Sequence, residues 1–106
     1  MERTHPDYLF KQFRVPRGSL GYIIADPVTR LAALVDPELE MVEPMIDSVF
    51  EHGLCPAYII DTHTYADHVS EVHILKSRTV AKLVMHREAP CGAVDLRVED
   101  GDGLCI

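Results

Sequence analysis

Four short runs of the sequence are almost entirely apolar, and they constrain the fold more than any other feature. The runs are YIIA, LAALV, YII and KLVM, at positions 22–25, 31–35, 58–60 and 82–85. A strand with one face in water alternates apolar and polar residues, whereas a nearly continuous apolar run is typical of a strand buried on both faces. The chain therefore needs a sheet with material packed on both of its faces.

Turn signals and a change of period set the order of the elements. PRGS and DPVT separate the first three strands and predict an antiparallel meander. Two later helical segments each stand between strands, and such crossovers imply parallel pairing. The predicted order is three strands, a helix, a strand, a helix and two strands. We expect strands at 9–15, 20–26, 30–36, 57–61, 81–86 and 94–100, helices at 38–54 and about 67–77, and the start of a further strand at 104–106.

The first helix is indicated by apolar residues that recur at intervals of four. Pro44 falls in its first turn, where proline is tolerated, and Gly53 is a stop signal. Two helices cover only one face of a sheet of this size. We therefore expect a partner on the other face, either another copy of the chain or a second protein. The apolar rows of the first predicted helix are Met41, Met45 and Val49, and Val42, Ile46 and Phe50.

Composition limits the class of protein. A chain of 106 residues is a single domain by length, and its net charge of −7 argues against nucleic acid or an anionic membrane surface as the main partner. No apolar run approaches the ~20 residues of a membrane span. The first ten residues, MERTHPDYLF, contain no signal-peptide core, so we expect a cytoplasmic protein.

Metal-capable side chains gather in residues 59–70, IIDTHTYADHVS. In extended backbone after the strand, His63 and Tyr65 share a side, while Asp67 and His68 open the following helix and can turn back toward it. Such a strand end is where α/β sheets place sites, and these ligands suit a first-row divalent metal. The alternative is a capping box, in which Thr64 and Asp67 only stabilise the helix start. Spacing alone leaves both open.

The segment THTYADH resembles the T-H-x-H-x-D-H signature of the metallo-β-lactamase superfamily, with Tyr65 in place of the second histidine. The flanking segments, FRVPRGSLGYIIADPVTRLAALVDPELE, EHGLCPAYIIDTHTYADHVSEVHILK and DLRVEDGDGL, are similar to the N-terminal half of the persulfide dioxygenase branch, near glyoxalase II. The resemblance implies an α/β fold: half of an αββα sandwich, with a mixed sheet and two helices on one face. We expect one truncated domain over residues 1–106.

The resemblance also implies site residues. His63 matches an iron ligand of the dioxygenases, whereas Asp67 and His68 match residues that hold the second metal in dinuclear members. Asp36, at the DP turn, lies near the site in such folds. Tyr65 is a departure, because a phenol is mostly protonated at neutral pH and is a poor ligand for zinc or ferrous iron. Iron or zinc is therefore expected to be weakly bound or absent.

The chain also stops at GDGLCI, before the second half of such a domain. We expect a protein without catalysis of its own, acting as a binding or structural homodimer through the uncovered sheet face. The alternative is a metal-dependent hydrolase or sulfur dioxygenase-like enzyme on a small thiol-derived substrate, with its site completed by dimerisation or a partner chain and with help from His73 or His86. A third alternative is a product of gene truncation without a selected function.

Overall fold

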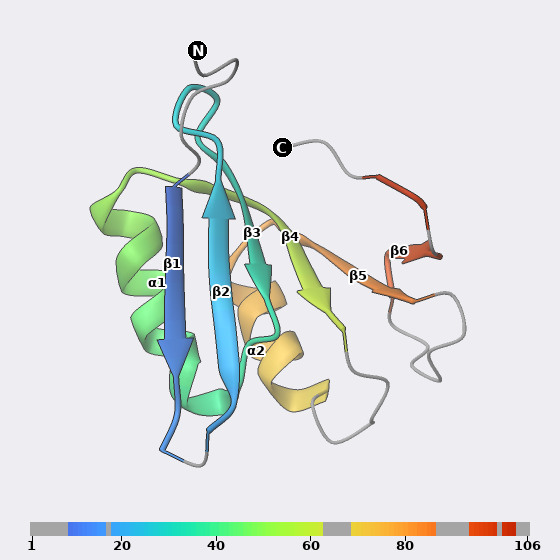
Figure 1. Ribbon diagram of the computed structural model, residues 1–106, viewed down its shortest axis with the longest axis horizontal. Coiled ribbons are helices and arrows are strands. Elements are labelled where there is room, and N and C mark those ends of the chain that lie inside the picture. The colour runs from blue at the N-terminus through green and yellow to red at the C-terminus, as the bar shows by residue number, and fades with distance from the viewer. Residues whose placement is uncertain (1–8, 17, 63–68, 87–93, 100, 104–106) are drawn as a thin grey trace.

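The computed structural model describes residues 9–16, 18–62, 69–86, 94–99 and 101–103, which form one sheet flanked by two α-helices (Figure 1). A single 3₁₀ turn, η1, precedes the first α-helix. The order of elements is the one predicted from the sequence, and the expected strand at 104–106 lies outside the described residues. In chain order the elements are β1 (Leu9–Arg14), β2 (Leu20–Ala25), β3 (Leu31–Val35), η1 (Leu39–Met41), α1 (Val42–Glu51), β4 (Cys55–Asp61), α2 (Val69–Arg78), β5 (Lys82–His86) and β6 (Leu96–Val98).

The strands lie side by side in chain order, from β1 at one edge to β6 at the other. The first three pair antiparallel, and β3 to β6 pair parallel, so both predictions about pairing are confirmed. Leu34 on β3 stands opposite Ile23 on one side and Ile59 on the other, which places these three side chains in one row. All three are buried, and they form the middle of the core.

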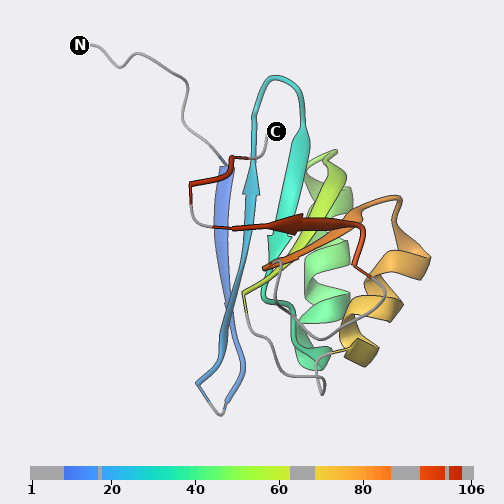
Figure 2. The ribbon, with the colours of Figure 1, turned by 90° about the vertical axis from the view of Figure 1, so that its right-hand side faces the viewer.

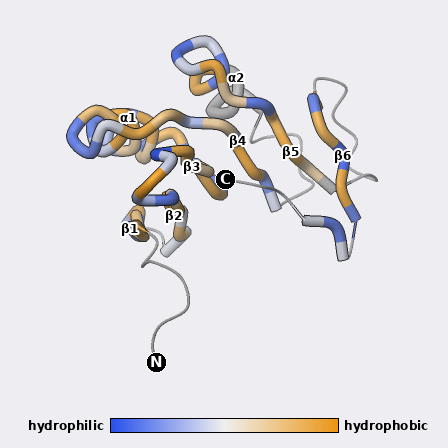
Figure 3. The backbone as a smooth tube through the Cα atoms, turned by 90° about the horizontal axis from the view of Figure 1, so that it is seen from above, coloured by the Kyte–Doolittle hydropathy of each residue, from blue (hydrophilic) through white to orange (hydrophobic). Residues whose placement is uncertain are grey.

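The two helices cover the same face of the sheet, as Figures 2 and 3 show. Met45 of α1 and Leu75 of α2 are fully buried against it. The prediction of a mixed sheet with two helices on one face is therefore confirmed. No helix in the described part of the chain is both long and apolar enough to span a membrane.

Helix α1 ends where the sequence predicts. Gly53 has φ of 62° and follows the last turn. Its N–H donates to the carbonyl of Phe50 at 3.2 Å, and the N–H of Leu54 donates to that of Val49 at 2.9 Å. This is the Schellman arrangement, which satisfies the last carbonyls of the helix and favours glycine at the left-handed position.

The predicted apolar rows of α1 are buried except at one position. Phe50, which shares a row with Val42 and Ile46, is 79% exposed. Each step of four residues turns about 40° around an α-helix, so the third member of such a row has rotated away from the sheet. Ser48 is buried in its place, at 3% exposure.

Two ion pairs hold α2 at its C-terminal end. Arg78 pairs with Glu43 of α1, and Lys76 Nζ lies 2.6 Å from Asp95 Oδ2, just before β6. The same carboxylate accepts a hydrogen bond from the N–H of Leu83 on β5. The bonds from Lys76 and Leu83 hold the pKa of Asp95 below its usual value, against a smaller opposing effect of desolvation. Asp95 thus joins a helix to two strands.

Among the residues that the structure describes, no helix covers the opposite face of the sheet, and that face is largely apolar. Strand register places its side chains in rows that cross the sheet, and most of them are only partly buried. On this face Phe10 stacks on Tyr22 with 5.5 Å between ring centroids. The central rows are Phe10, Ile24, Ala33, Tyr58 and Lys82, and Gln12, Tyr22, Val35, Ile60, Val84 and Leu96.

Candidate functional site

The ends of β3 and β4 lie together because these strands are parallel neighbours. β3 is followed by Asp36, and β4 by Thr62. Thr62 donates to the Asp36 carboxylate twice, from its N–H to Oδ1 at 2.7 Å and from its hydroxyl to Oδ2 at 2.6 Å. The N–H of Asp36 in turn donates to the carbonyl of Ile60 at 2.8 Å. The two strand ends are thus joined by three hydrogen bonds.

The backbone of Asp36 has a left-handed conformation, with φ of 52°. Aspartate tolerates this region better than most residues, because its short side chain can hydrogen-bond locally. The conformation turns the chain sharply away from β3 toward the buried Pro37. It also leaves the carboxylate directed at the start of the segment that follows β4. Asp36 therefore holds Thr62, the last described residue before that segment.

Asp61 is the last residue of β4, and only 6% of it is exposed. Two cavities of about 250 Å³ each flank it, one toward Asp36 and Glu38 and one toward Thr62 and Glu99. The strand ends therefore combine hollows with carboxylates. Within the residues that the structure describes, no three His, Cys, Asp or Glu side chains gather closely enough to hold a metal ion.

The predicted metal ligands His63, Asp67 and His68 lie outside the described residues, as do Tyr65 and Thr64 of the alternative capping box. Their placement therefore remains a prediction. The structure brings the described residues Asp36, Asp61 and Thr62 to the point where that segment begins.

Three other histidines are placed by the backbone, and one of them, His73, lies in the middle of α2. His86 is the last residue of β5 and lies at the same edge of the sheet as Asp61. His52 lies at the opposite end, after α1 and before β4, so it does not belong to this site.

Sequence reasoning placed Asp36 near the site but missed its partner Thr62. The available signal was positional. A short polar residue follows each of two apolar strands that were expected to be parallel, and parallel strands bring such residues together. A threonine after a buried strand is common enough that the pattern did not single it out.

Comparison with known proteins supports the fold and the resemblance to the metallo-β-lactamase superfamily. No protein-family model matches the sequence. Persulfide dioxygenase ETHE1, mitochondrial, from Homo sapiens is 29% identical over 99 residues, which cover 93% of this chain and 39% of the human protein. The crystal structure of ETHE1 from Myxococcus xanthus superposes with a TM-score of 0.80 at 33% identity, over 92% of this chain and 43% of that one.

A metallo-β-lactamase from Staphylococcus aureus shares the fold, with a TM-score of 0.76 at 21% identity over 92% of this chain and 30% of the other. The fold and the relatives together define the class: the chain belongs to the metallo-β-lactamase superfamily. Within it, the similarity extends to the persulfide dioxygenases, as the sequence predicted. The chain spans between about a sixth and two fifths of the length of the curated relatives it matches.

Proposed function

We propose that this chain is a binding or structural module that pairs with a second copy through the helix-free sheet face and has no catalysis of its own. The observation that carries the proposal is the apolar character of that face. Its central side chains, including Tyr22, Val35, Tyr58 and Ile60, are only partly buried although they lie in the middle of the sheet. Burial of such surface contributes roughly 25 cal/mol per Å².

A second copy fits this face for two reasons. A two-fold pair presents the same surface twice, and this surface is apolar in its central rows, so it can match itself. In the described part of the chain its cationic side chains are Arg14, on the edge strand β1, and Lys82, at the start of β5, and both are exposed. Pairing then leaves the charged groups at a polar rim, as stable interfaces do.

The absence of catalysis rests on Tyr65. A neutral imidazole is a good metal ligand at pH 7, whereas a phenol with a pKa of about 10 is mostly protonated there. A site that keeps His63, Asp67 and His68 but has lost one imidazole is expected to retain a metal weakly.

Multi-angle light scattering across a dilution series tests the pairing. The expected result is a dimer that dissociates in Ile60→Glu, which places a charge in the central row. Val80→Glu is the matched control, because Val80 is 91% exposed and lies outside the strands. Ile24→Glu on another strand repeats the test, and circular dichroism checks that each variant is folded. A wild-type monomer at every concentration would rule out the pairing.

A second candidate function is a metal-dependent hydrolase or sulfur dioxygenase-like enzyme on a small thiol-derived substrate, completed by a second copy or a partner chain. The observation that favours it is the pair of hydrogen bonds between Asp36 and Thr62, which fix the start of the predicted metal segment. His63, Asp67 and His68 would hold iron or zinc, and the metal would polarise the substrate.

Metal analysis of the purified protein separates the two candidates. The enzyme requires about one iron or zinc per chain, lost in His63→Ala. A wild-type content far below that, or one that His63→Ala leaves unchanged, contradicts the enzyme and leaves the dimer proposal standing. A cytoplasmic location is part of neither test and stays a prediction from the sequence.

A further inference from the structure

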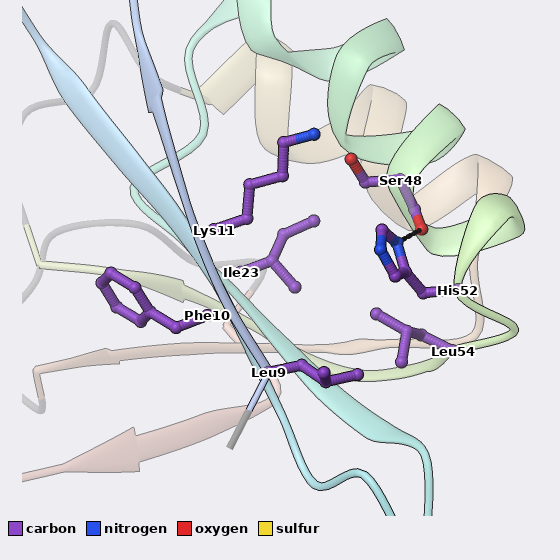
Figure 4. A pocket seen from close by; sticks show the side chains of 7 residues that line it. All are labelled: Leu9, Phe10, Lys11, Ile23, Ser48, His52 and Leu54. Atoms are coloured by element: carbon purple, nitrogen blue, oxygen red, sulfur yellow. Dashed lines mark hydrogen bonds between the residues drawn. The ribbon is translucent and has the colours of Figure 1, made fainter. Parts of the chain in front are cut away.

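A separate cavity of about 190 Å³ lies between β1 and the C-terminal half of α1 (Figure 4). Leu54, which lines it, comes before β4, whereas Thr62 of the candidate metal site comes after β4. The cavity is therefore at the opposite end of the sheet from that site. Neither proposed function uses it.

The cavity has an apolar wall and a polar wall. Leu9, Ile23 and Leu54 supply the apolar one, from β1, β2 and the turn after α1. The polar wall consists of Lys11 on β1, Ser48 on α1 and His52, which follows the last residue of α1. In Figure 4 the ammonium of Lys11 and the hydroxyl of Ser48 are directed to the same end of the cavity. An apolar cavity with a few convergent polar groups is the usual form of a small-molecule site.

Lys11 supplies a positive charge at that end. Its Nζ lies 5.5 Å from the centroid of the Phe13 ring, a cation–π contact that holds the ammonium beside the cavity. No carboxylate pairs with Lys11 among the residues that the structure describes. The Ser48 hydroxyl beside it can donate a hydrogen bond. An ammonium next to a hydroxyl suits the carboxylate of a ligand.

His52 forms the other end of the polar wall. Its Nδ1 lies 3.0 Å from the carbonyl oxygen of Ser48. A carbonyl only accepts, so Nδ1 carries the proton in this contact, and in the neutral ring Nε2 is left as an acceptor. An acceptor repels a carboxylate but suits a hydroxyl group. The two ends of the polar wall therefore favour different groups of one ligand.

We propose that this cavity binds a short-chain monocarboxylic acid that carries a hydroxyl group. The carboxylate pairs with Lys11 and accepts from Ser48, the ligand hydroxyl donates to Nε2 of His52, and the alkyl chain lies against Ile23 and Leu54. The proposal is independent of dimerisation and of any metal, because none of the side chains assigned to the ligand belongs to the sheet-face rows or to the predicted metal segment. Phe10, which also borders the cavity, belongs to those rows but is given no contact with the ligand.

Methyl-detected NMR titration with β-hydroxybutyrate tests the site. The expected result is saturable shifts of the Ile23 and Leu54 methyl groups at millimolar ligand. Lys11→Met weakens binding at least tenfold, whereas the control Lys82→Met, which removes a charge from the other sheet face, leaves it unchanged. Shifts that do not saturate, or an equal affinity in Lys11→Met, overturn the proposal.

Two comparison ligands test the assigned groups. Butyrate lacks the hydroxyl and is expected to bind several-fold more weakly, and His52→Phe removes that difference while still binding butyrate. Butanediol, which has no charge, is expected not to bind measurably. Equal binding of butanediol and β-hydroxybutyrate contradicts the role of Lys11, and an undiminished preference for the hydroxy acid in His52→Phe contradicts the role of His52.

Discussion

Replacing Gly21 by alanine tests how closely the turn before α1 packs on the sheet. A Cβ built at Gly21 would lie 2.5 Å from Met41 Sδ, 3.0 Å from the carbonyl oxygen of Asp36 and 3.1 Å from Met45 Cε. Met41 and Met45 are 2% and 0% exposed, so neither side chain can move into solvent. The added methyl group must therefore displace buried atoms and the backbone of Asp36.

The magnitude follows from two opposing effects. Overpacking of a core destabilises the folded state by about 1–3 kcal/mol. Alanine in place of glycine restricts the unfolded chain, which raises the free energy of unfolding by roughly 0.4–1 kcal/mol. We expect Gly21→Ala to lower the free energy of unfolding by about 1–2 kcal/mol. For a domain of this size the melting temperature falls by roughly 5–15 °C.

Thermal and urea unfolding measure the effect, with Gly103→Ala as the matched control. No atom lies within 4 Å of a Cβ at Gly103, and that residue is exposed, so its change is expected within about 0.5 kcal/mol. In a double-mutant cycle, Met41→Ala should relieve part of the loss caused by Gly21→Ala. Equal stability of the two glycine variants, or strict additivity with Met41→Ala, would refute the packing argument.

Two further predictions concern carboxylates that join strands. Asp36→Ala is expected to destabilise the fold by roughly 1 kcal/mol, because it removes both hydrogen bonds from the exposed Thr62. Asp36→Asn keeps an acceptor and is expected to lose less, and equal urea midpoints for the two variants would contradict this. The bonds from Lys76 and Leu83 lower the pKa of Asp95 in the folded protein below its usual value of 3.8. These bonds therefore stabilise the fold fully above about pH 3.8. The stabilisation is lost as the pH falls through the pKa of Asp95 in the folded protein. The stability difference between wild type and Asp95→Asn should therefore shrink on acidification in urea titrations, and a difference that stays constant from neutral pH to about pH 2 would argue against the assigned bonds.

The order of the elements could be predicted from local signals. Apolar runs marked the strands, PRGS and DPVT marked the turns of the meander, and the four-residue spacing from Met41 to Val49 marked α1. The end of α1 was predicted because only glycine adopts the left-handed conformation there without strain. The exposure of Phe50 was not predicted, because a row at intervals of four drifts around the helix, and its far end depends on where the sheet stops.

The candidate site, like the fold, was predicted from the sequence only in part. The resemblance to the metallo-β-lactamase superfamily implied that Asp36 lies near the metal site, and the structure places Asp36 at the end of β3, while the metal ligands His63, Asp67 and His68 stay a prediction. The bonds from Thr62 to Asp36 could not be predicted, since residues 26 positions apart meet only after β3 and β4 pair. The cavity lined by Lys11 and His52 could not be predicted from the sequence either, because its walls come from segments that are remote in the chain: β1, β2 and the C-terminal end of α1.

The sequence by itself determined the elements, their order and the apolar character of both sheet faces, because these depend on the period and type of neighbouring residues. Tertiary structure alone decided that the carboxylate of Asp36 meets Thr62, that Gly21 has no room for a side chain, and that Lys11, Ser48 and His52 share a cavity. Each of these depends on distances between strands and helices that are remote in the chain. Such distances are set by packing of the whole core rather than by any local pattern.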